Sequence, residues 1–328
     1  KAFRMKQLKI AMIGLPKPVG TFVWATLAMF FFVPGTYAAP IAKAGADLRS
    51  AINVPIILDG TGSSDSAGGK LTYLWRQLSG EPLEMIGQDR DKAMVISART
   101  AGTYTFRLQV SNGSTTATDD VTVTLARSSG RTLYVDNLLS SNCLNGNYSL
   151  ANRNGSGTNG NAYTIPQASA DASLPGDTIY VRGGTYANVL SSSVYLEVIH
   201  VTKSGTREAP IRFEAYPGER VVLTGFGYED RDLNGDGYAD GEKNPSKRET
   251  LFLVEADYIQ VKGFEMANSQ RFGMQVSGNF CYVEECVAHD NWLTGFLLHH
   301  GKTTNPLQGN VFRWLEGYNN RHGNGSSL

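Results

Sequence analysis

The stretch that decides the fold is YIQVKGFEMANSQRFGMQV at residues 258–276, because FCYVEECVAHDNWLTGFLL at residues 280–298 repeats its pattern 22 positions later without a gap. Ile259 aligns with Cys281, and Phe264 aligns with Cys286. A third copy, at residues 311–320, follows at an offset of 29, so the loop before it is longer. Self-similarity at a fixed short period indicates structural repeats that stack on one another.

A period of about 22 residues, divided into three short strands and their turns, predicts a right-handed parallel β-helix. The alignment puts Cys281 and Cys286 on apolar positions, so we expect both to be buried. Two polar columns also follow from it. We expect them to stack as turn ladders that satisfy backbone groups; they contain Asn268, Asp290 and Asn319 in one column and Ser269, Asn291 and Asn320 in the next.

The segment before these repeats supplies the start of the β-helix. A short helix is expected at residues 164–170 and a strand at 178–181, followed by strands at 194–201, 211–215 and 221–224. A helix at this place would cover the open end of the solenoid, which otherwise exposes its core and strand edges.

Residues 40–127 have a different pattern. Apolar residues alternate in short runs between turn signals, which predicts a β-sandwich of about seven strands with Trp75 at its centre. The segments LDGTGSSD, LTYLWRQLSG and GTYTFRLQVSNG, in this order, resemble a polycystic-kidney-disease (PKD) repeat, an immunoglobulin-like module. The resemblance implies a spacer or a module that contacts carbohydrate or protein. Residues 128–130 are expected to form a linker.

The segment from residue 131 to 328 resembles the parallel β-helix domains of polysaccharide lyases, with pectate lyase family nine as the closest resemblance. The segments PGDTIYVRGGTY and SGTREAPIRFEAYPGERVVLTG carry it, together with the Asn-rich rungs. The resemblance implies cleavage of an acidic polysaccharide by cation-assisted β-elimination, with calcium held by Asp residues and a Lys base. The chain departs from that pattern at Leu293, where Asp is expected. No Lys in the repeats occupies an evident base position, and the next expected Asp pair would follow Leu328, so we interpret the chain as the first part of a longer protein.

Composition narrows the function classes. The 30 basic and 30 acidic residues give no net charge, which argues against nucleic-acid binding. The 3 cysteines predict neither a disulfide framework nor a zinc site.

Residues 1–39 predict an export signal. Lysines precede an almost wholly apolar run at 21–33, and small residues follow at 34–39. An uncleaved membrane anchor is the alternative. In either case the rest of the chain is expected outside the cytoplasm, secreted or at the cell surface.

The loop at residues 230–240 is the clearest candidate for metal binding. Its spacing follows the alternating oxygen ligands of calcium loops, and we expect Ca²⁺ to stabilise it. The expected ligands are Asp232, Asn234, Asp236, the Tyr238 carbonyl and Asp240. The usual Glu position holds Lys243, although Glu242 is adjacent. A polar loop without metal is the alternative.

The candidate catalytic residues are Arg271, His322 and His289. Arg271, Leu293 and His322 share one column of the repeat, and an Arg or His there could neutralise a sugar carboxylate or act as base. Residues expected to bind substrate are Trp292, His299 and His300, while Trp314 could stack on sugar or pack within a strand. Solvated polar turns are the alternative for each.

The sequence thus favours a monomeric polysaccharide lyase, and a non-catalytic β-helix adhesin or glycan-binding surface protein is the second hypothesis. An Asp cluster and a Lys on the following rungs would favour the lyase.

Overall fold

The computed structural model describes residues 38–83, 85–86, 90–187, 195–225, 228–229, 241–242, 248–299 and 307–320. Three predictions lie outside these ranges: the export signal apart from residues 38–39, the calcium loop at 230–240, and the two histidines His300 and His322. None of the helices within the described ranges is long and apolar enough to cross a membrane.

The first part of the chain is a β-sandwich, as predicted. One sheet has the order β1-β7-β6-β3 and the other has the order β2-β5-β4. The strands are β1 (Leu48–Ala51), β2 (Ile56–Asp59), β3 (Thr72–Ser79), β4 (Met85–Ile86), β5 (Ala93–Ile96), β6 (Gly102–Ser111) and β7 (Thr116–Ala126). All pairs are antiparallel except β1 with β7.

Alternation along β6 explains how the sandwich forms its core. Tyr104, Phe106 and Leu108 are buried on one face, and Trp75 of β3 is fully buried against the same core. The central position predicted for Trp75 is therefore confirmed.

Gly113 has a φ of 91° in the turn between β6 and β7, a conformation that glycine adopts without strain.

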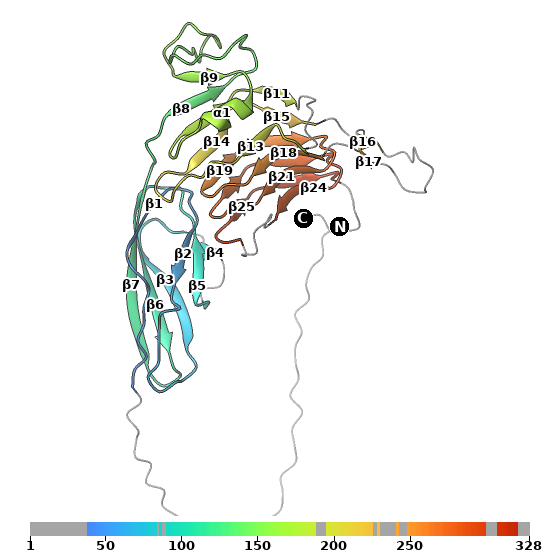
Figure 1. Ribbon diagram of the computed structural model, residues 1–328. Coiled ribbons are helices and arrows are strands. Elements are labelled where there is room, and N and C mark those ends of the chain that lie inside the picture. The colour runs from blue at the N-terminus through green and yellow to red at the C-terminus, as the bar shows by residue number, and fades with distance from the viewer. Residues whose placement is uncertain are drawn as a thin grey trace, which may run out of the picture. The chain divides into compact units, whose positions relative to one another are not determined.

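The second part is a parallel β-helix with three sheets, whose stacked strands are seen from the side in Figure 1. The largest sheet contains β8 (Thr132–Val135), β9 (Asn161–Tyr163), β10 (Thr178–Val181), β14 (Ile211–Ala215), β19 (Ile259–Lys262), β22 (Tyr282–Glu284) and β25 (Val311–Arg313). The second contains β11 (Gly184–Ala187), β15 (Val221–Thr224), β20 (Phe264–Ala267), β23 (Val287–His289) and β26 (Glu316–Tyr318). The third contains β12 (Tyr195–Leu196), β13 (Ile199–Val201), β18 (Arg248–Val254), β21 (Phe272–Val276) and β24 (Thr294–Leu298). A separate short hairpin joins β16 (Tyr228–Glu229) to β17 (Gly241–Glu242).

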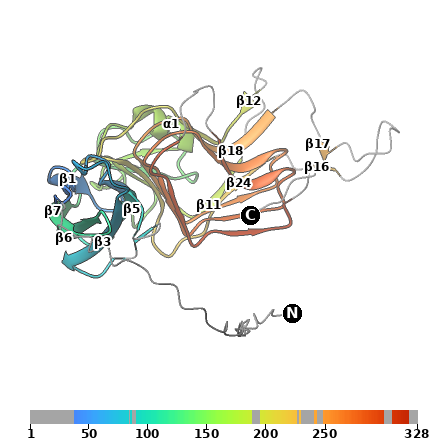
Figure 2. The same cartoon turned by 90° about the horizontal axis from the view of Figure 1, so that it is seen from below.

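Strand register confirms the predicted repeat. Val261 of β19 pairs with Val283 of β22 at the offset of 22, and Val283 pairs with Phe312 of β25 at the offset of 29. Because each rung pairs in parallel with the next, successive turns of the chain overlie one another in Figure 2.

The solenoid core runs between the three sheets. Cys281 and Cys286 are both buried in it, as the repeat alignment predicted. The predicted helix is α1 (Pro166–Ala172), and its residue Ala170 packs into the end of this core. One strand prediction needs correction. The run expected at 194–201 is interrupted, because Val198 turns into the core and donates its amide to Leu251 between β12 and β13.

Candidate functional site

The turn that joins β20 to β21, and its copies in the next two rungs, stack as the sequence predicted. Asn268, Asp290 and Asn319 begin these turns with φ values of 62°, 53° and 50°. Asn and Asp tolerate this left-handed conformation better than other residues with a side chain. The presence of Asn or Asp at each position of this column therefore follows first from the left-handed backbone conformation of the turn.

The neighbouring column forms an amide ladder inside the turn. Asn291 accepts a bond of 2.9 Å from the Ser269 amide, and its own side-chain nitrogen donates to Asn320 Oδ1 at 2.9 Å. The same nitrogen donates to the Met266 carbonyl at 3.2 Å. Asn291 is fully buried, so this ladder satisfies backbone groups that no water reaches.

A row of polar side chains, which we name the His289 row, lies on the outer face of the second sheet beside this turn. It contains Arg220, Glu265, His289, Asp290 and Tyr318. The residues come together because Ala267 of β20, His289 of β23 and Tyr318 of β26 are paired in register, and Glu265 points outward between the buried Phe264 and Met266.

Both ring nitrogens of His289 are engaged. Nε2 lies 3.0 Å from Glu265 Oε1, and Nδ1 lies 2.6 Å from Asp290 Oδ2. Arg220 then holds Glu265 from the other side, with contacts of 2.7 Å and 2.5 Å. The Tyr318 ring stacks on the imidazole at 4.6 Å between centroids and 3° between planes.

Charges of opposite sign set the protonation of the row. Burial opposes the charged form of His289, but its bonds to Glu265 and Asp290 outweigh burial and raise its pKa. Burial likewise opposes the charge on Glu265, and Arg220 and His289 reverse this effect and lower the pKa of that carboxyl. Carboxylate contacts at both ring nitrogens favour the protonated form of the imidazole, in which both nitrogens are donors.

The exposed members of the row are suited to binding a sugar chain. Tyr318 is 44% exposed and presents an aromatic face, and the Arg220 side chain is 74% exposed. An aromatic face can pack on a sugar ring, and the charge of Arg220, whose guanidinium is already bound to Glu265, can attract a sugar carboxylate. His289 joins these groups, because it contacts both Asp290 and the Tyr318 ring.

Arg271 and Trp292 lie in the same stack of turns as His289. The Arg271 carbonyl accepts the amide of Leu293 at 2.8 Å, which confirms that these residues share a column. Its guanidinium lies 4.8 Å from the centre of the Phe272 ring. Trp292 is half-buried and donates its amide to Ser269 at 2.9 Å. The structure thus brings these residues into one stack of turns, with Arg271 one rung before His289 and Trp292.

His299 lies apart from them. It is exposed and follows the far end of β24, about 16 Å along the strand from the turn. The roles predicted for His300 and His322 concern residues outside the described ranges.

The calcium site implied by the lyase resemblance does not fit the side chains present in the described turns. The first column offers the amides of Asn268 and Asn319 and one carboxylate, Asp290, which His289 already engages. Where the resemblance implies Asp, Leu293 is half-buried. No group of three or more His, Cys, Asp and Glu side chains that could hold a metal ion is present among the described residues.

Sequence reasoning missed Arg220, Glu265 and Tyr318. Glu265 was detectable as an acidic residue at an outward position between two apolar ones in a strand. Arg220 was not, because it lies 45 residues from Glu265 and the rungs between them have unequal lengths.

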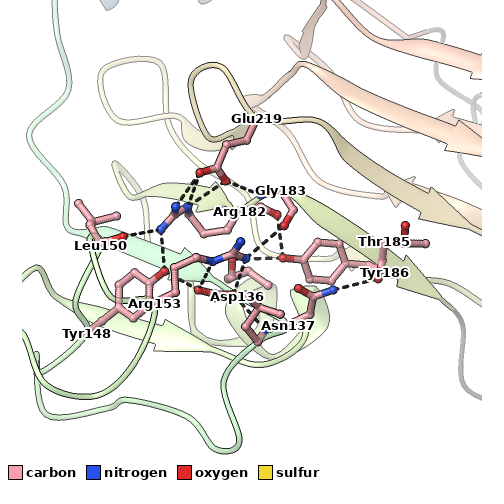
Figure 3. Close-up of polar contacts among 12 residues, drawn as sticks. Asp136, Asn137, Tyr148, Leu150, Arg153, Arg182, Gly183, Thr185, Tyr186 and Glu219 are labelled. Carbon is pink, nitrogen blue, oxygen red and sulfur yellow. Dashed lines mark hydrogen bonds and ion pairs between the residues drawn. The ribbon is translucent and has the colours of Figure 1, made fainter.

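A second polar network was also missed, and its role is structural (Figure 3). Asp136 is fully buried and accepts bonds from Arg153 at 2.6 Å and from Tyr148 at 2.7 Å. Arg182 binds Glu219 at 2.6 Å and Tyr148 at 3.0 Å. Burial alone would raise the pKa of the Asp136 carboxyl, but its hydrogen bonds from Arg153 and Tyr148 outweigh burial and lower this pKa. The network fastens the long connection between β8 and β9 to the end of the solenoid.

Comparison with known proteins places these observations in a family. Residues 148–326 match the model described as Pel9A-like, right handed beta helix region, and residues 44–125 match a family model of the PKD domain. The curated protein Pectate lyase PEL9 of Emericella nidulans is 32% identical over 158 residues, which are 47% of this chain and 34% of that protein. The chain therefore spans about a third of the length of the curated relative it matches.

Two solved structures are also similar. Pectate lyase Pel9A is 24% identical, with a TM-score of 0.35 over 51% of this chain and 36% of that chain. A rhamnogalacturonan lyase is 16% identical, with a TM-score of 0.34 over 58% of this chain and 52% of that chain. Because the match of the family model covers more than half of the 328 residues, the chain belongs to the Pel9A-like family of right-handed β-helices.

Proposed function

We propose that the protein is exported and cleaves an acidic, uronic-acid polysaccharide by β-elimination. The observation that carries this proposal is the family membership of the solenoid, joined to its 32% identity with a protein named as a pectate lyase. The His289 row supports it, because the row offers an exposed guanidinium and an aromatic face on one side of the solenoid.

β-Elimination needs a positive charge that neutralises the sugar carboxylate and a base that removes the neighbouring proton. In our proposal Arg220 and Arg271 supply positive charge, and Tyr318 and Trp292 stack on sugar rings. His289 positions Asp290 and Tyr318 through its fixed contacts. Among the described residues no lysine forms an ion pair with the His289 row, and we assign the role of base to none of its members.

The chemistry of the products tests this proposal. The full-length protein is incubated with polygalacturonate, alginate or chondroitin, and the products are analysed by mass spectrometry. We expect oligosaccharides that carry an unsaturated uronate and lack one water relative to hydrolytic products. Products with the mass of hydrolysis would contradict β-elimination and indicate a glycoside hydrolase.

A second candidate function is glycan binding without cleavage. It is favoured by the engagement of both His289 nitrogens and by the poor fit of the described turns to a calcium site. Electrophoresis in gels that contain the polysaccharide separates the two functions. Retardation that Tyr318→Ala abolishes, with an unchanged polymer length, would support binding alone.

A further inference from the structure

The largest sheet of the solenoid has a polar outer face. Tyr180, Glu214, Lys262 and Glu284 are paired in register on successive strands, so their side chains form one column. The adjacent outward column includes Arg212. Packing another part of the chain on charged side chains removes them from water, which costs free energy unless each charge is paired with an opposite charge or a hydrogen-bonding group.

The β-sandwich contacts this face through defined bonds. Gln260 donates its side-chain amide to the Ile52 carbonyl at 2.9 Å, and the Ala51 amide donates to the Arg207 carbonyl at 2.9 Å. Arg212 donates to Ser128 Oγ at 2.6 Å, so a residue of the predicted linker takes part in the contact.

Arg99 is the central contact of this interface. It forms an ion pair with Glu284, whose side chain is 3% exposed, and its guanidinium stacks 3.9 Å from the centre of the Trp314 ring. Lys262 binds the other oxygen of Glu284 at 3.1 Å. Trp314 was expected within a strand, but it lies in the turn between β25 and β26 with a φ of 48°, where it packs on Arg99.

A cleft of about 340 Å³ remains beside these contacts, and we name it the seam cleft. Its lining includes four cationic side chains and two carboxylates, an excess of two positive charges. Arg99 and Lys262 are both paired with Glu284 and Glu285, which leaves Arg127, Arg212 and Glu214 to face a ligand. The volume lies at the lower end of the range found for small-molecule sites.

Three groups in the seam cleft lack partners. Within the described residues the side chains of Arg127 and Glu214 make no hydrogen bond or ion pair, although the charges of Arg212, Lys262 and Arg127 act on the Glu214 carboxyl, and the buried Oδ1 of Asn53 has no hydrogen-bond partner. Burial raises the pKa of the Glu214 carboxyl. Asn53 has a φ of 60° and is therefore held in a left-handed conformation. An unpaired guanidinium calls for a carboxylate, and unpaired acceptors call for hydroxyl donors.

We propose that the seam cleft binds a uronic-acid residue of an acidic polysaccharide, at a site separate from the His289 row. One pyranose ring with its carboxylate supplies an anion for Arg127 and hydroxyl donors for the Glu214 carboxyl. This inference takes its glycan class from the proposed function, but it assigns a different surface, on the largest sheet and beside the β-sandwich. The module thus contributes to carbohydrate binding instead of only separating two parts of the chain.

Galacturonic acid is the probe that separates this site from catalysis, because a monosaccharide has no glycosidic bond to cleave. Its dissociation constant for the full-length protein is measured by NMR saturation transfer or calorimetry. Galactose, which lacks the carboxylate, and acetate, which lacks the hydroxyls, are the comparison ligands. We expect galacturonic acid to bind at least about tenfold more tightly than either, as one charge-assisted pairing predicts.

Variants locate the binding. Arg127→Ala removes an exposed side chain, so the fold is expected to persist, and we expect it to weaken galacturonic acid binding about tenfold. Arg76→Ala, an exposed arginine on β3 of the same sandwich, is the matched control and should change nothing. Equal affinity in Arg127→Ala and the unaltered protein would overturn the seam site, as would a loss caused only by Tyr318→Ala. Polysaccharide cleavage is measured separately on the same variants, so either proposal can fail while the other stands.

Discussion

His289 shows how single side chains are fixed on the solenoid surface. Its imidazole lies between two carboxylates and under a tyrosine ring, and Arg220 completes the charge balance. A histidine surrounded in this way is favoured in its protonated form. The ion pairs of the row are therefore expected to depend on pH through the protonation of His289.

The pH dependence of stability tests this position. The folded pKa of His289 is raised above its unfolded value, so its stabilising effect is complete below about pH 6.5 and is lost as pH rises through the folded pKa. We expect the melting temperature of the unaltered protein to fall more steeply with rising pH than that of His289→Asn. The measurement is a thermal melt of both proteins between about pH 6 and pH 9. Parallel curves would contradict the charged state assigned to His289.

The two rung cysteines are a second test at the scale of the residue. Burial raises the pKa of both Cys281 and Cys286 to about 12, so neither forms a thiolate near neutral pH. We expect no reaction of these thiols with a disulfide reagent in the folded protein at about pH 8 and full reaction after denaturation. A Cys143→Ser background isolates the pair. Rapid labelling of the folded variant would show that the core is open there.

At the scale of the element, the stacked turns depend on their amide ladder. Asn291 makes three side-chain hydrogen bonds and is fully buried, while Asn268 at the neighbouring column is exposed. These turns were predictable from sequence, because a gapless repeat places chemically similar residues above one another. The His289 row was predictable only in part, since the repeat aligns His289 with Tyr318, whereas the contact of Arg220 with Glu265 joins rungs of unequal length.

Substitution of the ladder should be costly. We expect Asn291→Ala to lower the free energy of unfolding by about 2 to 4 kcal/mol, because it removes three hydrogen bonds and leaves the Ser269 amide buried without a partner. Asn268→Gly is the matched control, since glycine accepts its φ of 62°, and a change below about 0.5 kcal/mol is expected. Urea unfolding followed by circular dichroism measures both. Equal effects would mean that the buried ladder adds nothing beyond turn geometry.

The loop at residues 230–240 is the other element that carries a prediction. Its spacing of Asp and Asn is that of a calcium loop, and we expect bound Ca²⁺ to protect it from proteases. Limited proteolysis with calcium or with EDTA should differ at this loop, and Asp236→Ala should be cut equally in both. Identical cleavage of the unaltered protein under the two conditions would argue against a calcium site.

At the scale of the whole molecule, the β-sandwich and the β-helix were both predictable from the sequence, but from different patterns. The sandwich follows from alternation within single strands such as β6, and the solenoid follows from the period between β19 and β22. The contacts of Arg99 with Glu284 and Trp314 were not readable, because they join residues about 185 to 215 positions apart that share no pattern. The departure at Leu293 was visible in the sequence, and the structure shows that this leucine is half-buried.

The central claim is that this member of the Pel9A-like family cleaves an acidic polysaccharide by β-elimination. The most direct test is the rate at which ultraviolet absorbance of the new carbon–carbon double bond rises when the full-length protein meets polygalacturonate, alginate or chondroitin. We predict a steady rise with at least one of them and a lower rate for Arg271→Ala at unchanged melting temperature. A flat trace with all three polysaccharides, from protein shown to be folded, would contradict the claim and favour glycan binding alone.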